Sequence, residues 1–452
     1  MRLIKILPFF LSSIVVMTGF AQGILEFQND SQKIVYANDI ILKIQEGGPI
    51  RYDGVIIRGN LNLNQVKKIL MDREWFETEV LGFDENIHVV DSSIEIKNSV
   101  IEDDVGFNNS IFYKLINFEN TTFKGYVDLR GAKFKKSAYF RRTTFNKSTY
   151  FDGAKFNYTS LSEAKFNQDA SFSTAIFTQD VNFNKVHFSC DTSSPWAAIF
   201  SNAKFFSDAN FENSVFLGDA VFTNTQFNKN ANFRSAQFQM DGKFDDAEFK
   251  DDVFFQDATF IGIIDFTRIR FSNMYIEWDK IYNKIKYDNE TYLSLIENYK
   301  KLGFFKYADD CYYRYRQIYK EKTISGIELI ADNILDCAYG YGTRPLNAII
   351  SSIISIVFFG FIWWICIFCS YENNPMKIGK IQQSRIDKLL AAIKFSFSIF
   401  FSGTPLVTDQ PKRPNLTGLL RYLMTVLFIL ERGVGLALFF FFLVAVGRTI
   451  IR

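Results

Sequence analysis

Two ionisable residues inside a long apolar run are the side chains of this sequence best placed to do chemistry. Glu431 and Arg432 interrupt the run at residues 416–447, which also contains Arg421. A run of this length predicts a membrane-spanning helix, where an uncompensated charge costs about 2.5–3.5 kcal/mol on insertion scales. The two charges are therefore expected to face a pore, a partner helix or each other's neighbours, and a functional role is the default interpretation. The alternative for Glu431 is a pairing with a basic residue of a neighbouring helix that holds subunits together.

Small residues next to these charges have two interpretations. Gly433 and Gly435 follow the charged pair directly, and they form either a hinge or a face for close helix packing. Upstream, the apolar segment 389–403 is only about half the length of a span, which predicts a re-entrant or interfacial helix. Ser402, Gly403 and Thr404 end that segment, where backbone carbonyls or hydroxyls would line a pore.

Enzymatic chemistry finds little support in this sequence. The chain has only two histidines, and we see no nucleophile with a base, no phosphate loop and no metal cluster, so we expect no catalysis, cofactor or metal. Cys366 and Cys369 form a CxxC, but they lie in an apolar run without a second pair, which favours ordinary helix packing. The five scattered cysteines are expected to be free. The balance of 51 basic and 49 acidic residues argues against a nucleic-acid partner.

The elements that would position these residues form a recognisable order. An apolar run at 346–370 precedes the half-length segment, and the longer run follows it. The GYG triplet at 340–342 comes before the first run, so we interpret its glycines as a turn of the chain into the membrane and not as a selectivity filter. The order is span, half-span, span, and we expect contact with membrane lipids.

This plan resembles the two-transmembrane pore domain of the potassium-channel superfamily. The resemblance covers residues 346–452 and includes the pattern Glu431-Arg432-Gly433-Val434-Gly435 and Gly447-Arg448 in the last run. It implies an ion channel that assembles as a homo-oligomer, a tetramer by analogy, with a monovalent cation as the permeant ion. The segment 400–405, FFSGTP, stands where the family has a TVGYGD-like filter, so potassium selectivity is not carried over.

Phenylalanine repeats through the middle of the chain. The sequence contains 51 Phe, and from Phe107 to Phe271 a Phe or Leu recurs at alternating steps of mostly five and six residues. A small residue stands two positions before most of them. Neither helix nor strand periodicity gives this spacing, so it indicates a repeat in which each unit turns a corner and returns the same residue to the interior.

The repeat resembles the pentapeptide-repeat family over residues 50–271. That resemblance implies a mainly β fold, a right-handed quadrilateral β-helix in which the small residue and the Phe both point inward. Four sides with alternating steps would make each coil roughly 22 residues long. Residues 22–49, with an amphipathic segment at 37–44, are expected to cap the first coil, and residues 64–88 to form an inserted loop.

The region between the repeat and the first span predicts helices. Tyr292, Leu295, Ile296 and Tyr299 follow helical spacing up to Gly303, and a second periodic segment follows, so residues 272–345 are expected to form a helical connector. On the repeat itself, residues 124–147 are mainly basic and residues 241–257 mainly acidic. This polarity is either an ordinary solvated surface or a docking patch for a protein partner.

Residues 1–21 have the pattern of a cleavable signal peptide, with basic residues, an apolar stretch and small residues at the end. The repeat would then be extracytoplasmic, the segment 371–415 cytoplasmic, and the C-terminus outside. The excess of Lys and Arg in that segment agrees with the positive-inside rule. Two functions follow as hypotheses: a multi-pass, channel-like protein of the cell membrane whose external solenoid senses or docks a partner, or a non-conducting membrane-anchored scaffold.

Overall fold

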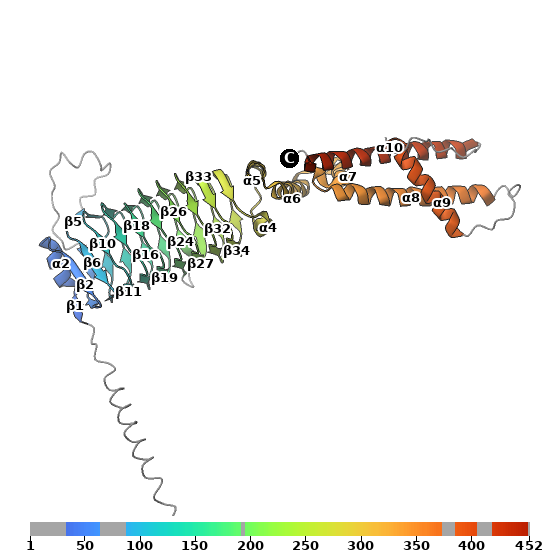
Figure 1. Cartoon of the computed structure of the whole chain (residues 1–452). Coiled ribbons are helices and arrows are strands. Elements are labelled where there is room, and N and C mark those ends of the chain that lie inside the picture. The colour runs from blue at the N-terminus through green and yellow to red at the C-terminus, as the bar shows by residue number, and fades with distance from the viewer. Residues whose placement is uncertain (1–32, 64–86, 191–194, 373–384, 405–417, 451–452) are drawn as a thin grey trace, which may run out of the picture. The chain divides into compact units, whose positions relative to one another are not determined.

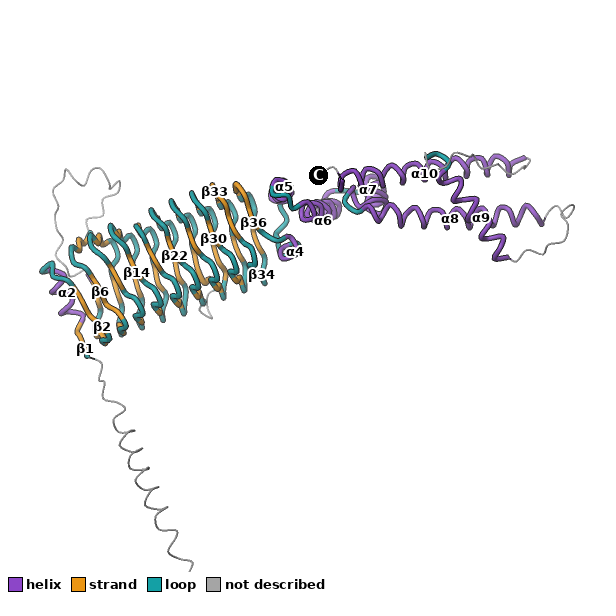
Figure 2. The backbone as a smooth tube through the Cα atoms, in the orientation of Figure 1, coloured by secondary structure: helices purple, strands orange, loops and turns teal. Residues whose placement is uncertain are grey.

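The computed structural model describes residues 33–63, 87–190, 195–372, 385–404 and 418–450 (Figure 1). The chain forms two compact units, Met1–Thr291 and Tyr292–Arg452. The predicted signal peptide at 1–21 and almost all of the predicted loop at 64–88 lie outside the described residues. The first unit is a stack of β-strand coils, and the second consists of helices (Figure 2).

The first unit is a β-solenoid with four short strands in each coil. Successive strands of one coil belong to four different ladders, and the strand pairings among the described residues are parallel, for example Thr122 with Thr144. The first ladder contains β1 (Ile34–Tyr36), β3 (Ile56–Arg58), β7 (Val100–Ile101), β11 (Thr122–Phe123), β15 (Thr144–Phe145), β19 (Lys165–Phe166), β23 (His187–Phe188), β27 (Val215–Phe216), β31 (Gln237–Phe238) and β34 (Thr259–Phe260). The second contains β4 (Leu61–Asn62), β8 (Val105–Gly106), β12 (Val127–Asp128), β16 (Thr149–Tyr150), β20 (Ala170–Ser171), β24 (Trp196–Ile199), β28 (Asp219–Val221), β32 (Gly242–Lys243) and β35 (Ile264–Asp265).

The other two ladders meet in the last strands of the solenoid. The third contains β5 (His88–Val90), β9 (Ser110–Phe112), β13 (Lys133–Phe134), β17 (Lys155–Phe156), β21 (Ile176–Phe177), β25 (Lys204–Phe205) and β29 (Gln226–Phe227). The fourth contains β2 (Ile50–Asp53), β6 (Ile94–Lys97), β10 (Ile116–Asn117), β14 (Ala138–Tyr139), β18 (Thr159–Ser160), β22 (Val181–Asn182), β26 (Ala209–Asn210) and β30 (Ala231–Asn232). Both ladders continue into the longer strands β33 (Glu248–Phe254) and β36 (Arg270–Tyr275).

The alternating steps of five and six residues have a backbone cause. Residues in the left-handed region recur once per pair of sides, as at Asn109, Asn120, Gly131, Arg142 and Gly153. A left-handed residue turns the chain sharply, and Asn, Asp and Gly tolerate that conformation best. One such residue accompanies each five-six pair, so two pairs complete a coil. The side chains of Asn98 and Asn120, 22 residues apart, accordingly join adjacent coils with a 2.9 Å hydrogen bond.

Phenylalanine fills the interior, as the repeat predicted. The rings at the repeat centres are buried and stack on the equivalent ring of the next coil, with Phe123, Phe145 and Phe166 separated by 5.1 and 4.7 Å between centroids. Rings on opposite sides of a coil meet edge to face, as do Phe211 and Phe222 at 5.5 Å and 89°. Stacked and edge-to-face geometries are the favourable ones for aromatic pairs. The core is therefore a set of ring ladders, interrupted only where Leu129 and Leu161 take the place of a Phe.

The position two residues before most of the Phe residues is small because it lies next to the neighbouring coil. Ala154 and Ala203 there are fully buried. Two threonines at this position donate their hydroxyl to a backbone carbonyl of the preceding coil: Thr143 to Phe118 at 2.9 Å, and Thr225 to Phe200 at 2.7 Å. These hydrogen bonds satisfy polar atoms that burial would otherwise leave unpaired.

Both ends of the solenoid carry helices. Helix α2 (Ala37–Gln45) buries Ile40, Ile41 and Ile44, which agrees with the predicted amphipathic cap. At the other end β36 runs to Tyr275, four residues beyond the predicted end of the repeat at 271. A short helix, α4 (Trp278–Ile281), follows with Trp278 and Ile281 buried.

The second unit begins within α5 (Asn289–Lys301) and continues through α6 (Phe305–Thr323), so the predicted helical hairpin is present. Gly303, with φ +78°, turns the chain between them. Helix α7 (Gly326–Tyr339) and the 3₁₀ turn η2 (Gly340–Gly342) lead to α8 (Pro345–Glu372), α9 (Arg385–Phe401) and α10 (Gly418–Ile450). All three residues of the GYG triplet have positive φ, and they form the turn between α7 and α8.

Two of these helices are long and apolar enough to cross a membrane. They are Pro345–Cys366 in α8 and Arg421–Arg448 in α10, with mean hydropathy of 2.3 and 2.2. Only 17% and 22% of their most apolar segments are buried within the protein, whereas the core helix of a soluble protein would be mostly buried. Their exposed apolar sides are consistent with association with a membrane.

Candidate functional site

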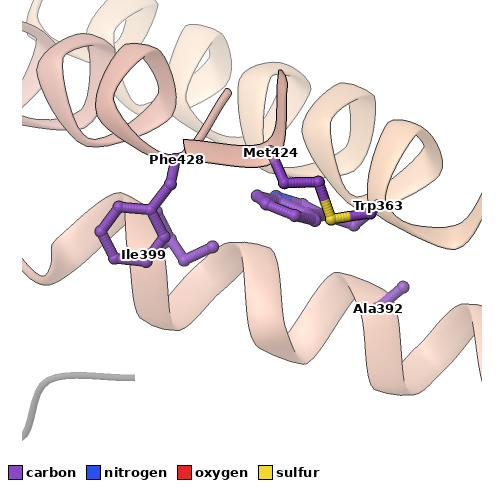
Figure 3. Packing of buried hydrophobic residues seen from close by; sticks show 5 residues of the cluster. All are labelled: Trp363, Ala392, Ile399, Met424 and Phe428. Atoms are coloured by element: carbon purple, nitrogen blue, oxygen red, sulfur yellow. The ribbon is translucent and has the colours of Figure 1, made fainter. Parts of the chain in front are cut away.

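The three C-terminal helices α8, α9 and α10 pack on one another with the shorter α9 in contact with both long helices. Their main cluster joins Met424 and Phe428 of α10 to Trp363 of α8 and to Ala392 and Ile399 of α9 (Figure 3). Gly360 permits a close approach in this bundle, because a Cβ there would lie 2.9 Å from the side chain of Ile393. Small residues allow helices in membranes to approach closely in this way.

Glu431 lies in the centre of this packing. Its side chain is fully buried, and its carboxylate accepts a 2.6 Å hydrogen bond from the indole Nε1 of Trp363. The hydroxyl of Ser396 contacts the other carboxylate oxygen and also lies 2.8 Å from the carbonyl oxygen of Ile356. A buried carboxyl group requires such partners. Glu431 thus joins α8, α9 and α10 of one chain, and its described partners are an indole and a hydroxyl.

Arg432 points toward the end of α9. A Cβ at Gly403 would lie 3.4 Å from both Cγ and Nε of Arg432, so the two residues are neighbours. Gly403 comes two residues after the last residue of α9, Phe401. The carbonyl end of a helix carries partial negative charge, which a nearby guanidinium stabilises. The sequence-predicted charge Arg432 and the predicted pore residue Gly403 are therefore brought together.

The hydroxyl groups predicted to line a pore are directed back toward α9. Ser402 Oγ donates to the carbonyl of Ile399 at 2.7 Å, and Thr404 Oγ1 donates to that of Phe401 at 2.8 Å. The same two carbonyls also accept the backbone N–H groups of Ser402 and Thr404, each at 3.0 Å, so each residue closes a turn at the end of the helix. The hydroxyl oxygen atoms keep lone pairs for a further donor or cation.

The two candidate hinge glycines occupy different surroundings. A Cβ on Gly435 would lie 2.0 Å from the carbonyl oxygen of Phe400, which is far inside contact distance, whereas a Cβ on Gly433 would meet nothing within 4 Å. Both residues lie within the continuous helix α10. Of the two alternatives from the sequence, Gly435 fits the close-packing face.

A polar network next to the two long apolar helices was not anticipated from the sequence. Asp332 of α7 is buried, pairs with Arg316 of α6 and accepts a 2.5 Å hydrogen bond from the hydroxyl of Tyr341. Burial and this hydrogen bond raise the pKa of Tyr341, so its phenol stays protonated and donates. Lys320 pairs with Asp336 at 2.8 Å.

The same network reaches the ends of both long helices. Arg448 of α10 pairs with Asp309 at 3.2 Å, and Arg344, just before α8, pairs with Asp310 at 2.8 Å. Asp309 and Asp310 are adjacent residues of α6. The ion pairs therefore fix α6 against the start of α8 and the end of α10. The two adjacent acidic residues in a tyrosine-rich helix were visible in the sequence. Their arginine partners could not be identified from it, because they lie far away along the chain.

The described residues lack the cluster of ligands that a metal site requires. Within them, no group of three or more His, Cys, Asp or Glu side chains is placed to hold a metal ion. Cys311 is buried, and burial raises the pKa of its thiol well above the ordinary value, which keeps the reactive thiolate form scarce.

Comparison with known proteins identifies one part of the chain. The family model described as Pentapeptide repeats (9 copies) matches residues 129–175, 151–193 and 195–237. No curated protein and no solved structure matches the chain. The matched residues all lie within the described coils and the short segment between them. The solenoid of this chain is therefore built from pentapeptide repeats.

Proposed function

We propose that this protein is a multi-pass protein of the cell membrane whose C-terminal unit is an ion-channel-like domain and whose pentapeptide-repeat solenoid serves sensing or partner docking outside the cytoplasm. The observation that carries the proposal is the packing of the short helix α9 between two long, outwardly apolar helices. A helix shorter than the two spans on either side of it is the plan of a pore domain. A secretory signal at 1–21 and a right-handed solenoid belong to the same proposal.

A pore of this kind requires several copies of the chain, because one copy supplies only two spans and one short helix. We therefore propose a homo-oligomer, a tetramer by analogy with two-span channels, that passes a monovalent cation. Ser402, Gly403 and Thr404 would line its narrowest part. The oligomeric state in detergent is the direct test, and a monomer at all accessible concentrations would contradict the channel.

Electrical recording tests conduction. The purified protein in planar bilayers is expected to pass cation current, which Glu431→Gln should alter while the protein stays folded. Gln keeps the hydrogen bonds, because its amide oxygen can accept from Trp363 and its amide nitrogen can donate to Ser396. The substitution thus separates the carboxyl group from the packing of the site. Identical currents in both proteins would limit Glu431 to a structural role, and silence of the wild type under varied ions and voltages would overturn conduction.

Orientation has its own test. We expect the segment 371–415 to be cytoplasmic and the C-terminus to be outside, because the segment is rich in Lys and Arg. Single cysteines within 377–380 and at the C-terminus of intact cells, treated with a membrane-impermeant thiol reagent, distinguish the two sides. The C-terminal cysteine should be labelled and the other should not. The reverse pattern would place the solenoid in the cytoplasm.

A non-conducting scaffold is the second candidate function. The enclosure of Glu431 by Trp363 and Ser396 favours it, because a carboxyl group held inside one chain stabilises helix packing without facing an ion pathway. In that case the helices anchor the solenoid, and a protein partner on its surface is the functional ligand. Electrical silence of a stable oligomer would support this second function.

A further inference from the structure

Helix α7 presents an apolar face to its surroundings. Ile327, Ile330 and Ile334 have relative exposures of 83%, 62% and 58%. Steps of three and four residues place these side chains on one side of a helix. Leaving three isoleucines in water is unfavourable at about 25 cal/mol for each Å² of apolar surface. We therefore expect this apolar face to be covered by a neighbour that removes it from water.

The opposite side of α7 is fixed by polar contacts with α6. Asp332 pairs with Arg316, and Asp336 pairs with Lys320 at 2.8 Å and accepts a 2.9 Å hydrogen bond from the hydroxyl of Tyr313. Asp332 and Asp336 lie one turn apart, so both contacts hold the same side of the helix. These contacts set the rotation of α7 about its axis and turn the isoleucines away from α6.

The C-terminal end of α7 joins the side of the membrane bundle. Ala338 packs with Ile356 of α8 and Leu438 of α10, and the ring of Tyr339 stacks on Phe441 with 4.6 Å between centroids. The hydroxyl of Ser351 donates to the carbonyl of Cys337 at 3.0 Å. The helix is thus attached within the first turns of α8, where Ile349, Ile350 and Ile353 are themselves exposed.

We propose that the face formed by Ile327, Ile330 and Ile334 lies on the lipid bilayer surface, as an interfacial helix that leads into α8. The inference rests on the proposed insertion of α8 and α10 into a membrane. The attachment of α7 to α8 supports this proposal. A bilayer that covers the exposed side of α8 also meets the end of α7 that is packed against α8. Amphipathic helices, which have one polar and one apolar face, bind at the boundary between the lipid headgroups and the acyl chains.

A second copy of the chain is a less suitable occupant. Stable protein interfaces use roughly 20–30 residues on each side, whereas α7 has 14 residues and only one apolar face. Its flanking positions Glu328 and Asn333 are also exposed. A narrow apolar face with polar flanks suits a lipid surface, where the flanks stay among headgroups and water.

Fluorescence in lipid vesicles tests the proposal. The full chain, with its native cysteines replaced by alanine, receives one cysteine at Ile330→Cys, Glu328→Cys or Ile354→Cys. Each cysteine carries a fluorophore sensitive to polarity. The proteins are reconstituted into vesicles of phosphatidylcholine and phosphatidylglycerol, with quenchers either on the lipid chains or in the water. Glu328 is the matched control, since it is exposed and lies on another side of α7. Ile354 reports on α8, where it is exposed within the predicted span.

We expect the fluorophore at position 330 to show a blue-shifted emission and quenching by lipid-attached groups, and the one at position 328 to be quenched from the water. Quenching of position 330 from the water only, together with lipid quenching at position 354, would overturn the inference and leave membrane insertion intact. Loss of lipid quenching at position 354 would instead overturn insertion and the inference with it. Disulfide crosslinking between copies at position 330 would assign the face to a second copy.

Discussion

Replacing Phe222 with alanine is expected to lower the unfolding free energy by about 3–5 kcal/mol. Phe222 is fully buried, and its ring stacks between Phe200 and Phe244, each at 4.9 Å between centroids. It also meets the edges of Phe211 and Phe233 at 5.5 and 5.3 Å. Neighbouring coils hold these rings in place, so they cannot collapse into the vacated space. Denaturant unfolding of the purified protein, followed by a spectroscopic signal of its β-structure, measures the decrease in unfolding free energy.

The chain provides a control with the same chemical change. Phe206 lies on the outside of the solenoid with a relative exposure of 49%, so Phe206→Ala removes a ring mostly in contact with water. We expect a change within about 0.5 kcal/mol for this exposed substitution. Equal unfolding midpoints for Phe222→Ala and the wild type would contradict the interior ring ladders.

Gly435→Ala is expected to destabilise the C-terminal bundle by about 1–3 kcal/mol, because the added methyl group overpacks a tight contact. The new Cβ would lie 2.0 Å from the carbonyl oxygen of Phe400 and 2.8 Å from its carbon. Both atoms belong to the backbone, so no side-chain rotation relieves the clash and α9 must move away from α10. Thermal unfolding in detergent should show a lower midpoint for this variant.

Gly433→Ala is the matched control for that experiment. Gly433 lies in the same helix, two residues earlier, and nothing approaches its Cβ position within 4 Å. Alanine also favours helix over glycine by about 1 kcal/mol in exposed positions. The control should therefore be neutral or slightly more stable than wild type. Equal destabilisation by both substitutions would indicate that flexibility at the glycine pair, and not close packing, is what matters.

The sequence predicted the solenoid well because its stabilising contacts repeat. Phe145 and Phe166 occupy equivalent positions in successive coils, so one local pattern specifies many long-range contacts. The coil geometry was harder to foresee. The alternating spacing depends on left-handed residues such as Asn120 and Asn224, and these follow no single residue type, since Arg142 and Thr174 fill the same role.

The contacts of the helical unit were less accessible from the sequence. The position of Glu431 within a long apolar run was evident from the sequence, but its partners Trp363 and Ser396 lie 68 and 35 residues away. The pairing of Arg316 with Asp332 depends on how α6 and α7 cross. Such contacts are specified by packing of whole helices, which a single sequence expresses only through the apolar faces. The spacing of residues along the chain does not predict these contacts.

The constant register of the coils makes the length of the solenoid adjustable. Val181 and Asn182 pair with Ala209 and Asn210 across a coil of 28 residues, and pairing on either side of it continues as in shorter coils. The extra length of this coil thus leaves the pairing of the coils on either side unchanged. Each coil contacts only its neighbours. If one whole coil were gained or lost by gene duplication or deletion, the coils on either side would therefore meet through the same kind of contacts as before. The length of the solenoid is therefore a property that evolution can change in steps of one coil, without redesign of either of its ends.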